Sequence, residues 1–179
     1  LPVLRELTAR GGGTLRYTVA LHADPGGRSL PESFEGLVFA SPADPTWYRL
    51  AGIKVWVDSD VPMRGGAVSV PYAGGGHGLL NLTQAELDAL ALRTRRAGLA
   101  FLAHATGDRA TAMALDAFER VQAGTGSRAE PGMLRVEHFG EFMLGPGDLE
   151  RAKRLGVSVN VTPGWIYTLA HSTVENLGA

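Results

Sequence analysis

The sequence contains no cysteine, so disulfide bridges and thiolate sites for metals or catalysis are excluded. It has no apolar run near the roughly 20 residues that a membrane-spanning helix needs. It also has no excess of charge of either sign, because 17 Lys and Arg balance 18 Asp and Glu. That balance disfavours nucleic acid or an anionic membrane as the main partner. A hydrophobic content of 45% is typical of a globular domain.

The two ends of the chain indicate a piece of a larger protein. The sequence starts at Leu1 rather than at methionine, and residues 1–10 have the pattern of the second half of a helix. Residues 175–179 show no closing element. Five strand patterns are present, whereas a complete (β/α)8 barrel has eight strands and about 250 residues. We therefore expect one domain over residues 1–179 that is part of a larger barrel. We expect a cytoplasmic protein. This sequence gives no information about a targeting segment.

Apolar runs of strand length alternate with helical patterns along the chain. The predicted strands cover residues 14–23, 51–58, 99–105, 133–139 and 157–162, and the predicted helices cover 1–10, 83–97, 109–122 and 146–155, with a short helix as one interpretation of 32–40. A helix, a glycine and a strand follow one another three times, which favours right-handed parallel βαβ units. The predicted fold class is therefore α/β, a partial (β/α)8 TIM barrel. The glycine-rich segment 59–80 is expected to cover an active site.

The helix that begins after Thr83 has the clearest local signals. Thr83 is a good N-cap, and Glu86 three residues later completes a capping box. Leu82 and Leu87 are spaced as a hydrophobic staple. Gly98 is the expected end of the helix.

Two histidines near the ends of neighbouring strand patterns are predicted to lie side by side. His104 is near the end of the 99–105 run, and His138 follows 34 residues later, about one βα period. Parallel strands of a barrel place their carboxyl ends, and their active sites, at one face. An isolated histidine is more often a hydrogen-bonded core or loop residue, but neutral imidazole is a good zinc ligand and the pair favours a metal site. The histidines not expected to be ligands are His22, His77 and His171.

Lys54 lies near the end of the 51–58 run and allows three interpretations. It is an ordinary lysine at a barrel mouth, a Schiff-base nucleophile, or a lysine carboxylated by carbon dioxide. A bare ammonium group is repelled by a divalent cation, whereas a carbamate is attracted to it. If the two histidines bind metal, the carboxylated form gains support.

Further residues at the strand ends are candidates for substrate contacts. Asp58 is a candidate ligand, general base or cap, and a role in starting the loop has at least equal weight. Asp108 and Arg109 are expected to pair with each other or to cap the next helix, although Arg109 is also a candidate for binding a substrate carboxylate. Trp165 is a candidate wall of the substrate pocket, with ordinary packing as the alternative.

Glu137 directly precedes the candidate ligand His138. Successive side chains of a strand point to opposite faces of the sheet. We therefore expect Glu137 to point toward the helix layer and to have a structural role.

Three segments together resemble amidohydrolase family 3: residues 52–58, residues 104–110 with the pattern His-Ala-x-Gly-Asp-Arg-Ala, and residues 135–138. The stretches 71–80 and 155–163 also match the pattern of this family. The resemblance covers nearly the whole chain, and the segment that begins at His104 is its most specific part. The family includes metal-dependent hydrolases and enzymes similar to N-substituted formamide deformylase.

The resemblance implies a distorted TIM barrel with a metal centre at the carboxyl ends of its strands. Carried over, Lys54 takes the place of the fourth-strand ligand, His104 of the fifth-strand ligand and His138 of the sixth-strand ligand. The family's His-x-His pair on the first strand and its aspartate on the eighth have no counterpart here, so about strands three to seven are present. The implied cofactor is one or two divalent ions, with zinc expected, bound weakly or not at all by this piece.

For the intact protein, the resemblance implies an amidohydrolase that cleaves a C–N bond other than a peptide bond with a metal-activated water. The expected partner is a small amide, N-formyl or cyclic amide substrate, without nucleic acid or membrane. No catalytic residue is assigned, because the usual aspartate is absent from this chain, and the piece itself is expected to be inactive. The alternatives are a non-catalytic piece that forms a homodimer through exposed strand edges and a Schiff-base lyase that uses Lys54.

Overall fold

The structure is a computed structural model that describes residues 2–10, 14–24, 30 and 46–178. Its elements are α1 (Pro2–Ala9), β1 (Tyr17–Ala23), β2 (Tyr48–Trp56), the 3-10 helix η2 (Val61–Met63), α2 (Gln84–Arg96), β3 (Ala100–His104), α3 (Asp108–Thr125), β4 (Leu134–Glu137), α4 (Asp148–Leu155), β5 (Ser158–Asn160) and α5 (Pro163–Leu177). The short helix predicted at 32–40 lies outside the described residues. No helix in the described ranges has both the length and the apolar character to cross a membrane.

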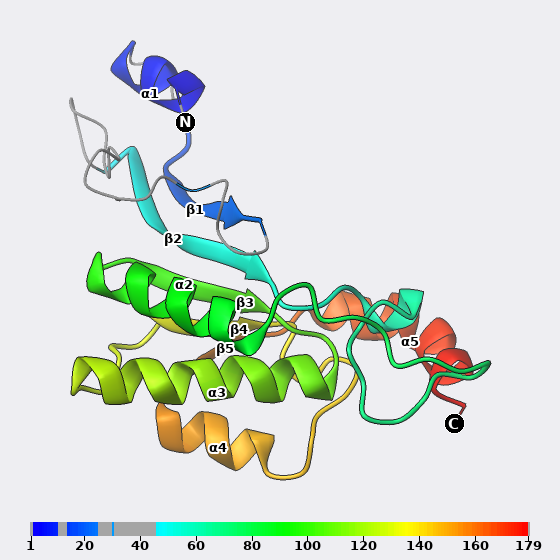
Figure 1. Cartoon of the computed structure of the whole chain (residues 1–179). Helices are drawn as coiled ribbons and strands as arrows, with labels where there is room; N and C mark the ends of the chain where they lie inside the picture. Colours follow the sequence, from blue (N-terminus) through cyan, green and yellow to red (C-terminus); the bar gives the residue numbers. More distant parts are fainter. Residues whose placement is uncertain (1, 11–13, 25–29, 31–45, 179) are drawn as a thin grey trace.

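The five strands form one parallel sheet in the order β1-β2-β3-β4-β5. From β2 onward a helix joins each strand to the next, and α2, α3 and α4 lie on one face of the sheet (Figure 1). The predicted α/β class is therefore confirmed. A parallel sheet with one helix between successive strands is consistent with part of a TIM barrel.

The hydrophobic core lies between this face of the sheet and the helices. Ile53 of β2 and Phe101 of β3 are completely buried there, together with Leu115 and Phe118 of α3. The rings of Phe101 and Phe118 meet edge to face, with centroids 6.2 Å apart. Each such side chain contributes about 1.5–3 kcal/mol through its burial. This core holds β2, β3 and β4 in the arrangement on which the candidate site depends.

The predicted capping box starts α2. The Thr83 hydroxyl accepts a hydrogen bond from the Glu86 amide at 3.3 Å, and the Glu86 carboxylate accepts one from the Thr83 amide at 2.7 Å. At the other end, Gly98 adopts a left-handed conformation with φ of 75° directly after the C-cap residue Ala97. Both ends predicted from the sequence are confirmed, because they depend on local contacts alone.

The opposite face of the sheet carries the polar candidates. Trp56, His104 and Glu137 lie in one row across β2, β3 and β4, and Lys54 lies one row earlier. The prediction that Glu137 points toward the helix layer is therefore wrong. The side chains of Glu137 and His138 do not follow strand alternation, because β4 ends at Glu137 and His138 has a left-handed backbone with φ of 67°.

Helix α5 is an element that the sequence analysis missed. Its start at Pro163 and its left-handed C-cap at Gly178, with φ of 72°, are ordinary helix signals. Near its end the buried Asn176 side chain donates to the Pro62 carbonyl at 2.6 Å and accepts from Arg64 Nε at 2.7 Å. Helix α5 therefore packs against segment 59–80, beyond the arrowheads of the strands (Figure 1).

Candidate metal centre

The two predicted histidines lie side by side at the carboxyl ends of neighbouring strands. His104 is the last residue of β3, and His138 follows directly after β4. Their ring centroids are 4.8 Å apart, and the ring planes meet at 66°. Zinc–imidazole bonds of about 2 Å require two ligand nitrogens within roughly 4 Å of each other. The separation of the rings is compatible with one shared ion.

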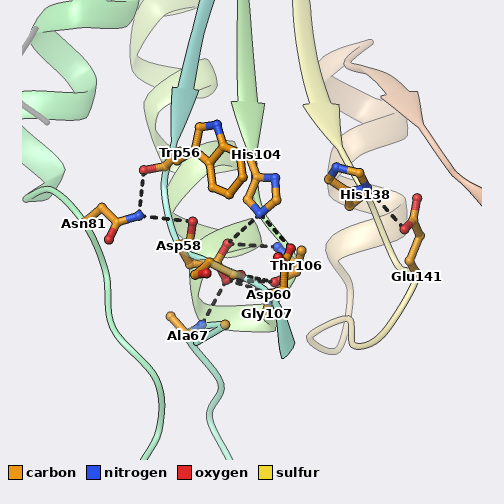
Figure 2. Close-up of polar contacts among 12 residues, drawn as sticks. Trp56, Asp58, Asp60, Ala67, Asn81, His104, Thr106, Gly107, His138 and Glu141 are labelled. Atoms are coloured by element: carbon orange, nitrogen blue, oxygen red, sulfur yellow. Dashed lines mark hydrogen bonds and ion pairs between the residues drawn. The ribbon is translucent and has the colours of Figure 1, made fainter. Parts of the chain in front are cut away.

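One nitrogen of each ring faces a carboxylate (Figure 2). His104 Nε2 lies 3.5 Å from Asp60 Oδ1 and 4.0 Å from Asp58 Oδ1. His138 Nδ1 lies 3.2 Å from Glu141 Oε2. The second nitrogens, which are His104 Nδ1 and His138 Nε2, point toward one another (Figure 2). The pair therefore directs two nitrogen donors into the same space.

Burial keeps His104 neutral. Only 1% of the residue is exposed, and burial together with the positive charge of Lys54 lowers its pKa from 6.5 to about 3. Within the described part of the chain its Nε2 has no hydrogen-bond partner. A metal ligand must be a neutral imidazole, so the environment of His104 favours the form that binds.

Each histidine is stacked on a tryptophan. Trp56 lies parallel to His104 with ring centroids 4.3 Å apart and an interplanar angle of 10°. Trp165 of α5 lies parallel to His138 at 4.3 Å and 1°. The structure thus places the predicted Trp165 directly at the pair, and both stacks restrict the rotation of the imidazole rings.

Lys54 lies on the same face of the sheet, in register with His22 of β1. Burial lowers the pKa of Lys54 from 10.5 to about 8, against the opposing effect of the Glu137 carboxylate. A lowered pKa increases the fraction of neutral amine, which both covalent interpretations of this lysine require. The positive charge of Lys54 also lowers the pKa of His104. The structure therefore brings all three predicted ligands to one face of the sheet.

Glu137 places a negative charge next to Lys54. Its carboxylate accepts hydrogen bonds from Arg135 Nε and, at 2.6 Å, from Asn160 Nδ2. Burial raises the pKa of Glu137, but the Asn160 hydrogen bond and the charges of Lys54 and Arg135 outweigh it and hold the pKa below 4.5. Glu137 is therefore ionised near neutral pH.

Asp58 holds three segments together. Its fully buried carboxylate accepts hydrogen bonds from the backbone amides of Ala67 at 2.9 Å, Thr106 at 3.0 Å and Gly107 at 2.9 Å. Burial raises its pKa from 3.8 to about 7, and these hydrogen bonds act in the opposite direction. With its oxygens engaged by amides, Asp58 links β2, segment 59–80 and the loop after β3.

The other two residues proposed near the next helix do not join the histidine pair. Asp108 begins α3, and its Oδ1 accepts a hydrogen bond from the Ser69 amide at 2.8 Å. Arg109 is exposed and lines a cavity of about 370 Å³ with residues from the starts of α2 and α3. Asp108 therefore anchors segment 59–80, and Arg109 lies in the helix layer.

A cavity of about 530 Å³ opens beside the stacked pair of Trp56 and His104 and is lined by His22, Ala23, Trp56 and Asn81. Trp56 is 41% exposed there, and the ring of His22 meets it edge to face at 6.5 Å. A larger cavity of about 640 Å³ includes residues near the amino ends of the strands, such as Thr18 and Ala100. The smaller one lies at the carboxyl ends of the strands, the end at which parallel barrels do chemistry.

Three residues at the pair were missed by the sequence analysis: Trp56, Asp60 and Glu141. Strand alternation contained the signal for Trp56, which is two residues after Lys54 in β2 and so shares its face. Asp60 and Glu141 follow their strands in irregular backbone. Their directions depend on loop conformation, for which the sequence held no signal.

The donors present fit a divalent metal ion. The two imidazoles lie next to one another, and His104 Nδ1 and His138 Nε2 are directed into the same space (Figure 2). Among the described residues, no three His, Cys, Asp or Glu side chains are grouped to hold an ion. Further ligation therefore has to come from Lys54 or from other groups.

Comparison with known proteins agrees with this fold. A model of the amidohydrolase family matches residues 1–177. Two crystal structures of uncharacterized metal-dependent hydrolases, from Pyrococcus furiosus and Pyrococcus horikoshii OT3, cover 99% of this chain with TM-scores of 0.80 and 0.78, and each is 26% identical. Protein LONG AFTER FAR-RED 3 of Arabidopsis thaliana is 28% identical over 135 residues, or 74% of this chain.

The chain is much shorter than these relatives. It spans 35% and 33% of the two hydrolases and 22% of the Arabidopsis protein.

Proposed function

The chain belongs to the amidohydrolase family, and from this premise we propose that the protein is a metal-dependent hydrolase of C–N bonds other than peptide bonds. The substrate is a small amide, N-formyl compound or cyclic amide. We assign one or two divalent ions, with zinc as the leading candidate, to His104, His138 and Lys54. The observation that carries this proposal is the histidine pair, whose rings lie 4.8 Å apart with one nitrogen each directed into the same space.

In this function, the residues of the chain bind and orient. When bound, a divalent ion supplies Lewis-acid polarisation of the scissile carbonyl and lowers the pKa of a water. His104 and His138 provide neutral nitrogens, and the stacked Trp56 and Trp165 hold the two ring planes. The 530 Å³ cavity beside Trp56 is of the size of small-molecule sites and receives the part of the substrate that does not react.

Segment 59–80 restricts access of water to this site. Asp58 holds its Ala67 amide, Asp108 holds its Ser69 amide, and Asn176 of α5 binds the Pro62 carbonyl. The segment is therefore fastened at three points. Exclusion of water strengthens the electrostatic interactions of a site.

Lys54 serves as the third ligand in a carboxylated form. Its neutral amine attacks the carbon of carbon dioxide, an N–C bond forms, and one proton of the nitrogen leaves to solvent. The product is an anionic carbamate, which a divalent cation attracts, whereas it repels the ammonium form. Labelling with ¹³C-bicarbonate in the presence of zinc should give a carbamate carbon signal that is absent in Lys54→Met. A spectrum without that signal would remove Lys54 from the ligand set.

Zinc titration of the purified chain tests the metal site. Binding should weaken more than tenfold in His104→Ala and in His138→Ala, because each removes one of the paired nitrogens. His171→Ala is the matched control, since this histidine is exposed on α5 and pairs with Glu175. Equal zinc affinity in all three variants would refute the assignment. Hydrolysis of formamides and cyclic amides by the zinc-loaded intact protein is then the test of substrate class, because this piece by itself is expected to be inactive.

A further inference from the structure

We propose that Glu141 is a positioning residue that fixes the tautomer of His138 and so presents its Nε2 for metal binding. This inference rests on the proposed function, because it concerns the same site. A neutral imidazole carries its proton on one nitrogen and can ligate a metal only through the other. The partner of Nδ1 therefore decides whether Nε2 is available.

The carboxylate of Glu141 is buried and engaged at both oxygens. Its side chain is 0% exposed, and that of His138 is 13% exposed. Oε2 lies 3.2 Å from His138 Nδ1, and Oε1 accepts a hydrogen bond from the Thr162 amide at the start of α5. One oxygen is thus anchored to the backbone, which aims the other at the imidazole.

The backbone around His138 is equally constrained. Its amide donates to the Asn160 carbonyl at 2.9 Å, and its own carbonyl accepts from the Glu141 amide at 3.2 Å. The left-handed φ of 67° is uncommon for a residue other than glycine and persists where surrounding contacts enforce it. Trp165 stacks on one face of the ring at 4.3 Å. Together these contacts leave the imidazole one orientation, with Nδ1 on Glu141 and Nε2 toward His104 (Figure 2).

The Glu141 carboxylate then determines which ring nitrogen of His138 carries the proton. An ionised carboxylate only accepts hydrogen bonds, so Nδ1 of His138 must be the protonated nitrogen. The lone pair of Nε2 is left free and faces the space shared with His104.

Glu141→Gln gives a sharp test, because the anchor at Thr162 dictates how the glutamine orients. The Thr162 N–H needs an acceptor, so the carbonyl oxygen of the glutamine takes the Oε1 position. Its amide nitrogen then faces His138 Nδ1 as a donor. Nδ1 must become the acceptor, and the proton moves to Nε2, the nitrogen required for the metal.

Long-range ¹H–¹⁵N spectra of the histidine rings report the tautomer without any metal. We expect the Nδ1–H form of His138 in the unaltered chain and the Nε2–H form in Glu141→Gln. The affinity for zinc ion should fall 10- to 100-fold in the variant, as is typical for loss of the outer partner of a ligand. Glu150→Gln, an exposed exchange on α4, should change neither readout.

Two results would overturn the inference. The first is an unchanged His138 tautomer in a folded Glu141→Gln variant, which would leave Glu141 with a purely structural role. The second is a reversed tautomer with unchanged zinc affinity. Should the glutamine variant fail to fold by circular dichroism, Thr162→Pro, which removes the anchoring N–H, replaces it and should give a mixture of tautomers. If the unaltered chain binds no zinc, the proposed metal site fails, while the tautomer spectra still decide the role of Glu141.

Discussion

Replacing Asp58 by alanine is expected to remove most of the stability of this fold. The Asp58 carboxylate is fully buried and accepts three backbone amides, from Ala67, Thr106 and Gly107, at 2.9 to 3.0 Å. Those amides belong to segment 59–80 and to the loop before α3, and alanine leaves all three without this partner. Each buried donor without a partner costs about 1–3 kcal/mol, so three cost roughly 3–9 kcal/mol. Native domains are stable by only about 5–15 kcal/mol.

Asp58→Asn separates this explanation from a simple loss of charge. Its carbonyl oxygen can take the Oδ2 position, which accepts from Ala67 and Gly107. Its NH2 group then faces the Thr106 N–H, which is the one backbone amide left without an acceptor. The expected loss in the free energy of unfolding is therefore about 1–3 kcal/mol. The alanine variant should therefore be clearly less stable than the asparagine variant.

Urea unfolding followed by circular dichroism measures both losses. Asp88→Asn is the matched control, because Asp88 lies on α2, is only partly buried and pairs with Arg120 at 3.1 Å. Ion pairs of this kind contribute about 0–1 kcal/mol. If Asp58→Ala unfolds at the same urea concentration as Asp88→Asn, the reasoning about the three amides is refuted.

Two more predictions concern glycine packing and acid sensitivity. A Cβ on Gly107 would lie 2.1 Å from the Ala67 carbonyl oxygen, so Gly107→Ala should lose at least about 1–3 kcal/mol. Gly164→Ala on α5 has nothing within 4 Å and should gain about 0.5–1 kcal/mol; similar melting temperatures for the two variants would contradict this. The Arg151 hydrogen bond of 2.8 Å holds the pKa of Glu119 below 4.5, so its stabilisation is present above pH 4.5 and is lost as the pH falls through the lower value of the folded state. Arg151→Met should therefore flatten the acid limb of a stability–pH curve, and an unchanged limb would be the contrary result.

Most secondary structure was predictable because its signals are local. The capping box of Thr83 and Glu86 starts α2 as expected, and Gly98 follows its end. All five predicted strands exist. Four are shorter than their apolar runs, whereas β2 begins at Tyr48, before its predicted start at residue 51, and ends at Trp56. Helix α5 was missed although Pro163 and Gly178 stand at its ends.

The site was predictable only in part. The spacing of one βα unit between His104 and His138 was enough to place their rings together, since parallel strands end at one edge. The same reasoning was wrong for Glu137, because it assumed that His138 still belonged to the strand. A left-handed residue directly after β4 removes that alternation.

The sequence by itself determined which residues form strands and helices and which strand ends carry imidazole and amine groups. These properties follow from periodicity, capping and chain order, each of which acts over a few residues. Only the tertiary structure decided the partners of those groups: Trp56 and Trp165 on the ring faces, Asp60 and Glu141 at the ring nitrogens. Trp56 comes from β2, whereas Trp165, Asp60 and Glu141 come from α5 and from loops. The directions of these three are set by packing and buried hydrogen bonds between segments far apart in the chain.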